Sequence, residues 1–400
     1  MLLYESVALT AVAYFVLCGL APWFRSKHGR VLYFGTSLAV YAPWFLVHVL
    51  HVPIRLWAAC TAGAWVFACL LWIVFGVPWL SLVKFRKGLR RLITRRFPPK
   101  SELVDGGRRQ VIASLALPAV SLSLGGVGSL GANSGFVVKH VELPLHDWPK
   151  ALDGFRIGQI TDVHIGDFVS VQTLLRAVEV LNRSNVHLQA MTGDLIDDLT
   201  YLEPTFDALR CCRAPYGMLS ILGNHEKMHS RLNPILARYA EERGRSPIRL
   251  LVDESEVIRH NGASMRVIGV DFPMRENGRH SLQKPLRMTL MQESAERAFA
   301  ELPSNGEARI CLSHHPEFFP FAAKRSVSVT LSGHTHGGQI AFLGQPLFPV
   351  YDYMLGHYQL GKSHLYVSGG TGHWLPYRVG VPTEVTVITL RSLGERGPHD

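Results

Sequence analysis

The sequence has 400 residues, of which 48% are hydrophobic, and 41 Lys and Arg against 31 Asp and Glu give a formal net charge of +10. Residues 1–110 hold 14 basic and 3 acidic residues, a net +11, whereas the remainder holds 27 and 28, a net −1. The remainder therefore lacks the positive excess that nucleic-acid binding requires, and nucleic acid is excluded as a predicted partner. The six Cys residues match neither a metal-binding spacing nor a disulfide framework.

The front of the chain contains three apolar stretches, at about 6–24, 31–50 and 56–83. Each is long enough to cross the roughly 30 Å hydrocarbon core of a bilayer as a helix. Trp residues lie near the ends of these stretches, where indole rings anchor spans at the membrane interface: Trp23, Trp44, Trp57 and Trp79. We predict that residues 1–110 form a polytopic α-helical membrane module.

Basic residues set the predicted topology of this module. Ten Lys and Arg residues lie in the loop 84–109, so the positive-inside rule makes this loop cytoplasmic and the amino terminus external. Residues 111–132 then carry no charge, and we predict that 111–135 form a fourth span and a tether. This span would place the following domain, 136–400, outside the cytoplasm. The alternative is a cytoplasmic domain with the uncharged segment on or in its surface.

Five polar clusters follow, each directly after an apolar run of four to eight residues. The runs are expected to be buried strands, because most contain β-branched residues and several are followed by glycine. We predict these strands at 155–161, 188–192, 218–222, 310–313 and 327–332. Leu174, Val178 and Leu181 recur at helical spacing between the first two runs, which predicts a helical crossover between parallel strands.

The clusters themselves have the composition of a metal site. They are Asp162-Val163-His164, Gly193-Asp194, Gly223-Asn224-His225-Glu226, Ser313-His314-His315-Pro316 and Gly333-His334-Thr335-His336. Asp, Asn and His suit hard-to-borderline divalent ions, and ligands in open α/β sheets collect beyond the carboxyl ends of strands. Asp194 is central enough in the series to bridge two ions. Two ions about 4 Å apart can clamp a phosphoryl group.

From about Phe155 to Leu390 the sequence resembles the calcineurin-like metallophosphoesterase superfamily. It is most similar to a membrane-associated bacterial branch, through the motif from Ser332 to Ile340 and the ending around Arg378 and 382–385. The resemblance implies a four-layer α/β/β/α sandwich behind the transmembrane module. Combined with the apolar spans and the charge-based topology, it predicts a multi-pass protein of the bacterial inner (cell) membrane, with the catalytic domain periplasmic or extracellular.

The resemblance also assigns roles position by position. Asp162, His164 and His336 would hold one ion, Asn224, His314 and His334 the other, and Asp194 would bridge them. His225 would face the substrate and protonate the leaving alkoxide. His314 rather than His315 is chosen because the family has its ligand two positions before the proline.

The expected function is a membrane-anchored binuclear-metal phosphoesterase that hydrolyses phosphoester or pyrophosphate bonds by metal-activated hydroxide. The cofactors would be two divalent metal ions (Mn, Fe, Zn or Mg), among which the donors do not choose. The substrate would be a small-molecule phosphoester or, by family analogy, a lipid-linked one. Two alternatives are a membrane transport or signalling protein regulated by the phosphoesterase domain, and a non-catalytic metal-binding module.

Several residues have two interpretations. Asp197 could orient a ligand histidine or be a solvated carboxylate at a helix start. Arg378 could contact a substrate phosphate or be a surface arginine. Phe318, Phe319 and Phe321 could be core residues or an apolar lip. Residues 227–262 and 271–308 are expected to interrupt the sheets and supply the substrate rim.

Overall fold

The structure is a computed structural model of the chain. It describes residues 2–20, 22–50, 55–94, 123, 126, 128, 135–228, 231–275, 283–300, 302–303, 307–347, 349–374 and 376–393. These residues fall into two compact units, Met1–Asn133 with Leu375–Tyr377, and Ser134–Trp374 with Arg378–Asp400. The predicted fourth span and tether, 111–135, lies almost entirely outside the described residues.

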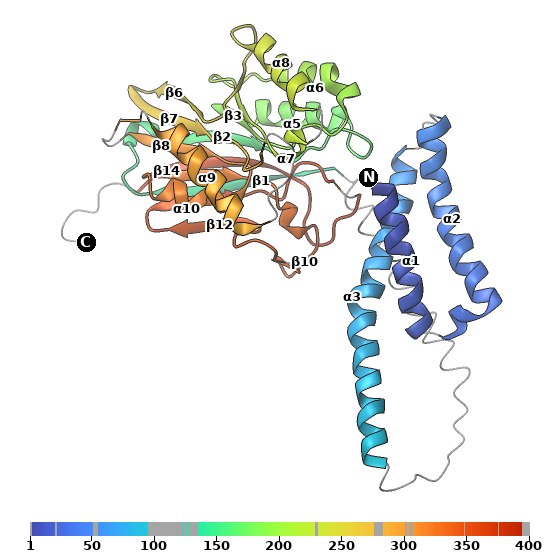
Figure 1. The fold of residues 1–400 in the computed structure, drawn as a ribbon. Coiled ribbons are helices and arrows are strands. Elements are labelled where there is room, and N and C mark those ends of the chain that lie inside the picture. The colour runs from blue at the N-terminus through green and yellow to red at the C-terminus, as the bar shows by residue number, and fades with distance from the viewer. Residues whose placement is uncertain are drawn as a thin grey trace. The chain divides into compact units, whose positions relative to one another are not determined.

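The first unit is helical (Figure 1). It contains α1 (Leu2–Leu20), the short 3-10 helix η1 (Pro22–Arg25), α2 (Lys27–Leu50) and α3 (Arg55–Thr94). Gly76 of α3 lets α1 approach closely, because a Cβ there would lie 2.5 Å from Cγ1 of Val16. The predicted loop at 84 is instead helical through Thr94, since its Leu, Lys and Arg residues are good helix formers.

One helical stretch in the described part of this unit, Ala64–Arg86, is long and apolar enough to cross a membrane, and Val7–Leu20 is a shorter apolar one. The predicted spans 6–24, 31–50 and 56–83 are thus largely helical, and among the residues that the structure describes, length and composition single out a stretch of the third. Side chains exposed at 50% or more, such as Phe15 and Leu38, give the outer surface of the bundle an apolar character.

The second unit is a mixed α/β fold built on two six-stranded sheets. The first sheet runs in the order β1 (Val137–Leu145), β14 (Glu384–Ser392), β2 (Phe155–Ile160), β3 (Leu188–Thr192), β4 (Met218–Ile221) and β5 (Ile248–Leu250). Strands β2 to β5 are parallel neighbours, and β14 pairs with β1 in parallel and with β2 antiparallel.

The second sheet runs in the order β12 (Gly356–Leu360), β13 (Ser363–Val367), β9 (Val329–Ser332), β8 (Ala308–Leu312), β7 (Ala263–Gly269) and β6 (Glu254–His260). Its four inner strands are parallel and its two edge strands antiparallel. A separate hairpin joins β10 (Ala341–Phe342) to β11 (Gln345–Pro346).

The helices of this unit are α5 (Val171–Arg183), α6 (Leu202–Arg210), α7 (Asn224–Lys227), α8 (Leu232–Glu242), α9 (Lys284–Phe299) and α10 (Phe319–Ala323). The short 3-10 helices are η2 (Lys150–Leu152), η3 (Leu199–Tyr201), η4 (Pro316–Phe318) and η5 (His336–Gly338).

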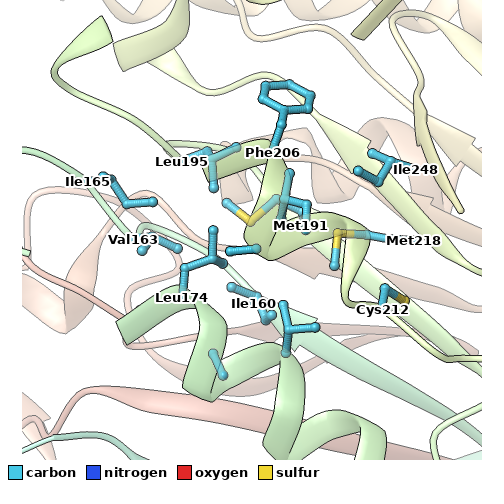
Figure 2. Close-up of a cluster of buried hydrophobic side chains, with 14 of the residues drawn as sticks. Ile160, Val163, Ile165, Leu174, Met191, Leu195, Phe206, Cys212, Met218 and Ile248 are labelled. Carbon is cyan, nitrogen blue, oxygen red and sulfur yellow. The ribbon is translucent and has the colours of Figure 1, made fainter. Parts of the chain in front are cut away.

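Several buried clusters hold these elements together. One is shared by the two sheets and contains Ile157, Ala190, Ile310 and Leu331. A second joins α5, α6 and α8 to the first sheet, and Figure 2 shows several of its side chains, among them Leu174, Met191 and Phe206. A third packs α9 and α10 against the second sheet. At Gly158 of β2, Leu181 of α5 approaches so closely that any Cβ would clash.

Most sequence-based elements match the structure within two residues. The strand predicted at 188–192 is confirmed, as is the parallel crossover through α5, whose predicted apolar face is buried. The expectation that 227–262 interrupts the sheets is wrong, because β5 and β6 add an edge strand to each sheet. Their alternation is weak in sequence because edge strands bury few side chains.

Candidate metal centre

The polar clusters emerge at the carboxyl ends of five strands. Strands β2, β3 and β4 are parallel neighbours, so Asp162, Asp194 and Asn224 leave the first sheet at one edge. Strands β8 and β9 are parallel neighbours in the second sheet and lead to His314 and His334. All the predicted ligands except the partly exposed His334 are buried.

Five of the seven candidate ligands have a left-handed backbone conformation. Their φ angles are 51° for Asp162, 55° for His164, 53° for Asp194, 72° for His334 and 49° for His336. A positive φ is uncommon outside glycine and costs energy, so such residues concentrate where function requires a particular side-chain direction. Here the turns after the strands aim the side chains inward.

The first group of candidate ligands is Asp162, His164 and His336. The Nε2 atoms of the two imidazoles are 3.0 Å apart, and Nε2 of His336 lies 3.3 Å from Oδ1 of Asp162. The lone pairs of neutral imidazoles and a carboxylate repel one another at such distances unless a proton or a cation lies between them. This geometry suits a cation held by all three.

The second group is Asp194, His314 and His334. Oδ2 of Asp194 lies 3.1 Å from Nε2 of His314 and 3.7 Å from Nε2 of His164 in the first group. Asp194 therefore stands between the two groups, where a shared ligand belongs.

The buried amide oxygen of Asn224 shows whether these residues fit metal ions. Its side chain is 6% exposed, and its Oδ1 atom has no hydrogen-bond partner among the described residues. A buried amide oxygen without a partner costs about 1–3 kcal/mol, and a divalent ion is a natural partner for it. The donor set of Asp, Asn and His oxygens and nitrogens thus fits divalent ions.

His314, the predicted ligand, lies in the second candidate group, whereas His315 does not. Nδ1 of His314 lies 2.7 Å from the carbonyl oxygen of Thr192, to which it can donate, leaving Nε2 as a lone-pair donor. Nδ1 of His315 instead accepts from the backbone N–H of Glu317 and caps η4.

Asp197 is an orienting carboxylate rather than a helix-start residue. Its Oδ1 lies 2.6 Å from Nδ1 of His225, and its Oδ2 lies 3.2 Å from Nδ1 of His164. The neighbouring Asp198 caps η3 by accepting from the N–H of Thr200. One carboxylate thus fixes both a candidate ligand and the candidate proton donor.

The charges of this cluster reinforce one another. Burial disfavours the charged form of His225, but Asp194 and Asp197 outweigh it and raise its pKa to about 9. Burial likewise opposes ionisation of Asp197, yet His164 and His225 hold the pKa of Asp197 well below its usual range. The Asp197 contact favours the protonated form of the imidazole, which is the form that can give up a proton.

Glu226 is a structural member of the site that sequence reasoning left without a role. Its buried carboxylate accepts hydrogen bonds from the N–H groups of Gly223, Asp194 and Leu195 at 2.7–2.9 Å. It thereby ties the turn after β4 to the turn after β3 and fixes Asp194. The signal was a Glu three residues after Gly223, as in a capping box.

Arg378 is not on the surface, so that interpretation is wrong. Its side chain is 4% exposed, and its guanidinium donates to the carbonyl oxygens of Gly369 and Gly372. Nη2 also lies 2.8 Å from Nδ1 of His336. A guanidinium has only donors, so Nδ1 accepts and the ring is held with Nε2 toward His164. Burial lowers the pKa of Arg378 to about 10.

The suggested phenylalanine lip is core. Phe318 and Phe319 are 1% and 0% exposed and belong to two buried clusters, and Phe321 packs against one of them. The short helices η4 and α10 turn these side chains inward against the second sheet.

The family model and the relatives that match this chain agree with one another. The sequence model of the calcineurin-like phosphoesterases matches residues 155–338. The chain is 30% identical over 252 residues to the uncharacterized metallophosphoesterase YkuE of Bacillus subtilis, covering 61% of this chain and 82% of that one. It is 25% identical over 382 residues to a zebrafish (Danio rerio) transmembrane protein with metallophosphoesterase domain, covering 85% of this chain and 80% of that one.

Among solved structures, the chain is similar to a dimetal phosphatase from Danio rerio. The sequence identity is 14% and the TM-score 0.38, and the match covers 59% of this chain and 99% of that one.

Proposed function

The chain belongs to the calcineurin-like metallophosphoesterase family and is a phosphoester hydrolase, and we propose that it is a membrane-anchored enzyme with a binuclear metal site. The observation that carries the binuclear site is the position of Asp194. One of its carboxylate oxygens is within 3.1 Å of His314 and 3.7 Å of His164, which belong to different ligand groups. A carboxylate so placed can be shared by two ions.

The proposed assignment follows the two groups. Asp162, His164 and His336 hold one ion, Asn224, His314 and His334 hold the other, and Asp194 belongs to both. When bound, two divalent ions (Mn, Fe, Zn or Mg) would activate a water and neutralise the charge that develops on the phosphoryl group. The backbone turns and the buried carboxylate of Glu226 preorganise this set.

His225 is the proposed proton donor to the leaving alkoxide. Its ring is 22% exposed, so it can reach a substrate while Asp197 holds Nδ1. This leaves Nε2 to carry the transferred proton. Arg378 is proposed to act on catalysis only through His336, whose ring it orients.

Membrane anchoring is the second part of the proposal. It is supported by the apolar helical stretch Ala64–Arg86 and by the similarity to the zebrafish transmembrane protein with metallophosphoesterase domain. We propose that 1–110 form the multi-pass module, 111–135 the fourth span and tether, and 136–400 the catalytic domain, exposed on the periplasmic or extracellular side of a bacterial inner membrane. The side of the membrane is tested with two reporters, each fused at Gly154: one that is active only after export and one that is active only in the cytoplasm. If the first is inactive and the second active, the catalytic domain is cytoplasmic.

The proposal extends to the architecture of the second unit and to the class of substrate. The second unit is a four-layer α/β/β/α sandwich, supported by one core shared by both sheets and two cores shared with helices. The substrate is a small-molecule or lipid-linked phosphoester or pyrophosphate, with no nucleic acid involved.

The test begins with metal content. Purified full-length protein, loaded with Mn, should contain two ions per chain by elemental analysis. It should hydrolyse members of a panel of mono-, di- and pyrophosphoesters, with and without acyl chains. Asp198→Asn is a matched control, because it changes a neighbouring aspartate that only caps η3. One ion per chain, with full activity, would contradict the binuclear proposal.

A further inference from the structure

The β10–β11 hairpin and the residue before Tyr351 expose an unusual set of apolar side chains. Phe342, Leu343, Leu347 and Val350, here called the apolar arm, are 72%, 86%, 45% and 72% exposed. Other large apolar side chains exposed on this unit, such as Val257, Leu360 and Leu393, are 38–48% exposed and well separated in sequence. Figure 1 shows β10 projecting from the body of the unit.

The turn of this hairpin is strained in a way that stability alone does not explain. Leu343 and Gly344, its two central residues, have φ angles of 49° and 77°. Turns of this kind favour Asn or Gly at both positions, and a bulky residue at positive φ is an outlier. A leucine there, almost fully exposed, indicates a role for the side chain itself.

Both ends of the arm are fixed to the metal centre. The N–H of Gln339 donates to the carbonyl oxygen of His336, and Ile340 pairs with Val379. At the far end, the hydroxyl of Tyr351 lies 3.2 Å from Nε2 of His334. The arm is thus an extension of the rim that carries two candidate ligands.

The composition of the arm identifies what it contacts. No Asp, Glu, Lys or Arg occurs from Gly337 to Tyr351. A stable protein interface takes roughly 20–30 residues a side, far more than this tip supplies. Exposed aromatic and aliphatic side chains enter the bilayer interface, where stable attachment takes more than one signal, and the same chain carries a helix long enough and apolar enough to cross a bilayer.

We propose that the apolar arm inserts into the interfacial zone of the lipid bilayer and holds the metal centre at the level of the headgroups. This inference rests on the proposed membrane anchoring. The arm adds a second, local contact to the anchor, and it acts on the rim that bears His334 and His336 rather than on the fold.

A photoactivatable benzophenone amino acid tests the contact in the full chain, reconstituted in vesicles of phosphatidylethanolamine and phosphatidylglycerol. It is placed at Leu343, at Leu82 within the apolar helix, or at Leu360, which is 47% exposed on the β12–β13 hairpin. After illumination, lipid adducts are measured by mass spectrometry. We expect adducts at Leu343 and Leu82, and at least tenfold fewer at Leu360.

The other outcomes separate the two proposals. Adducts at Leu82 but not Leu343 would overturn the arm proposal and leave the anchor standing. Adducts at Leu343 without Leu82 support the arm and count against the anchor, and adducts at neither position overturn both. Equal adduct yields at Leu343 and Leu360, or protein adducts at Leu343, would also overturn the arm's specific contact with lipid.

Discussion

The metal centre and the core of the helical unit both bury clusters of polar groups, but for opposite reasons. In the helical unit, the Thr10 hydroxyl accepts from Nε1 of Trp65 and lies 2.9 Å from the Tyr41 hydroxyl, while the Tyr33 hydroxyl donates to the Thr10 carbonyl. At the metal centre, facing imidazoles and carboxylates cannot all satisfy one another. Thr10 and its partners satisfy one another, whereas the facing imidazoles and carboxylates need protons or a cation between them.

This contrast predicts that changes at the metal centre mainly affect activity. The largest effect is expected for Asp194→Asn, because it removes the negative charge shared by both ligand groups. Activity on a water-soluble phosphodiester should fall below detection, and elemental analysis should show lower occupancy of both ions. Loss of only one ion with intact activity would show that Asp194 is not shared.

His225→Ala should separate proton transfer from metal binding. We expect the turnover number to fall by roughly 100-fold or more, as for a lost general acid, with both ions retained. The proton-donor assignment is wrong if metal content falls as far as it does in Asp194→Asn. A substrate with a good leaving group, such as a nitrophenyl ester, should lose less, because its alkoxide needs less protonation.

Asp197→Asn, compared with Asp198→Asn, isolates the orienting carboxylate. Asp197 contacts His164 and His225, and partners of this kind are typically worth 10- to 100-fold in metal affinity or activity. Asp198→Asn should change activity by less than twofold, since it alters only the cap of η3. Equal losses in the two variants, measured by kcat and Mn affinity, would mean that local folding and not orientation is responsible.

The candidate ligands could be predicted from sequence because the chemistry fixes residue type and strands place them. Asp162, Asp194 and Asn224 each follow an apolar run, and parallel pairing brings the ends of such runs to one edge. The roles of Asp197 and Arg378 could not be predicted from sequence, since the local sequence around a polar loop residue does not show whether its side chain faces solvent or a ligand. Only long-range contacts such as Arg378 with His336 decide between them.

The exposure of apolar residues in loops is equally hard to predict from the local sequence. Phe319 and Phe342 both lie in loops or short elements after a candidate ligand, yet one is fully buried and the other 72% exposed. Helix α10 turns Phe319 against the second sheet, whereas the β10–β11 hairpin is a separate two-stranded sheet that leaves Phe342 exposed. Local hydropathy does not report which surface a turn faces, so the sequence alone does not distinguish a buried phenylalanine such as Phe319 from an exposed one such as Phe342.

The helical unit provides the smallest and most selective test. Thr10→Val keeps the shape of the side chain but removes the hydroxyl that Trp65 and Tyr41 contact, while the backbone acceptor of Tyr33 remains. Interhelical hydrogen bonds in membranes contribute about 0.6 kcal/mol each on average, so two lost contacts should cost about 1 kcal/mol. Thermal unfolding in detergent, followed by far-ultraviolet circular dichroism, should shift by a few degrees at most. Thr10→Ser restores the hydroxyl and should restore the midpoint of unfolding.

Hydrolysis of a water-soluble phosphodiester should stay unchanged in both variants, because the polar groups of this cluster hydrogen-bond to one another and not to a metal or a substrate. A fall in that activity in Thr10→Val alone would show that the helical unit takes part in building the catalytic site.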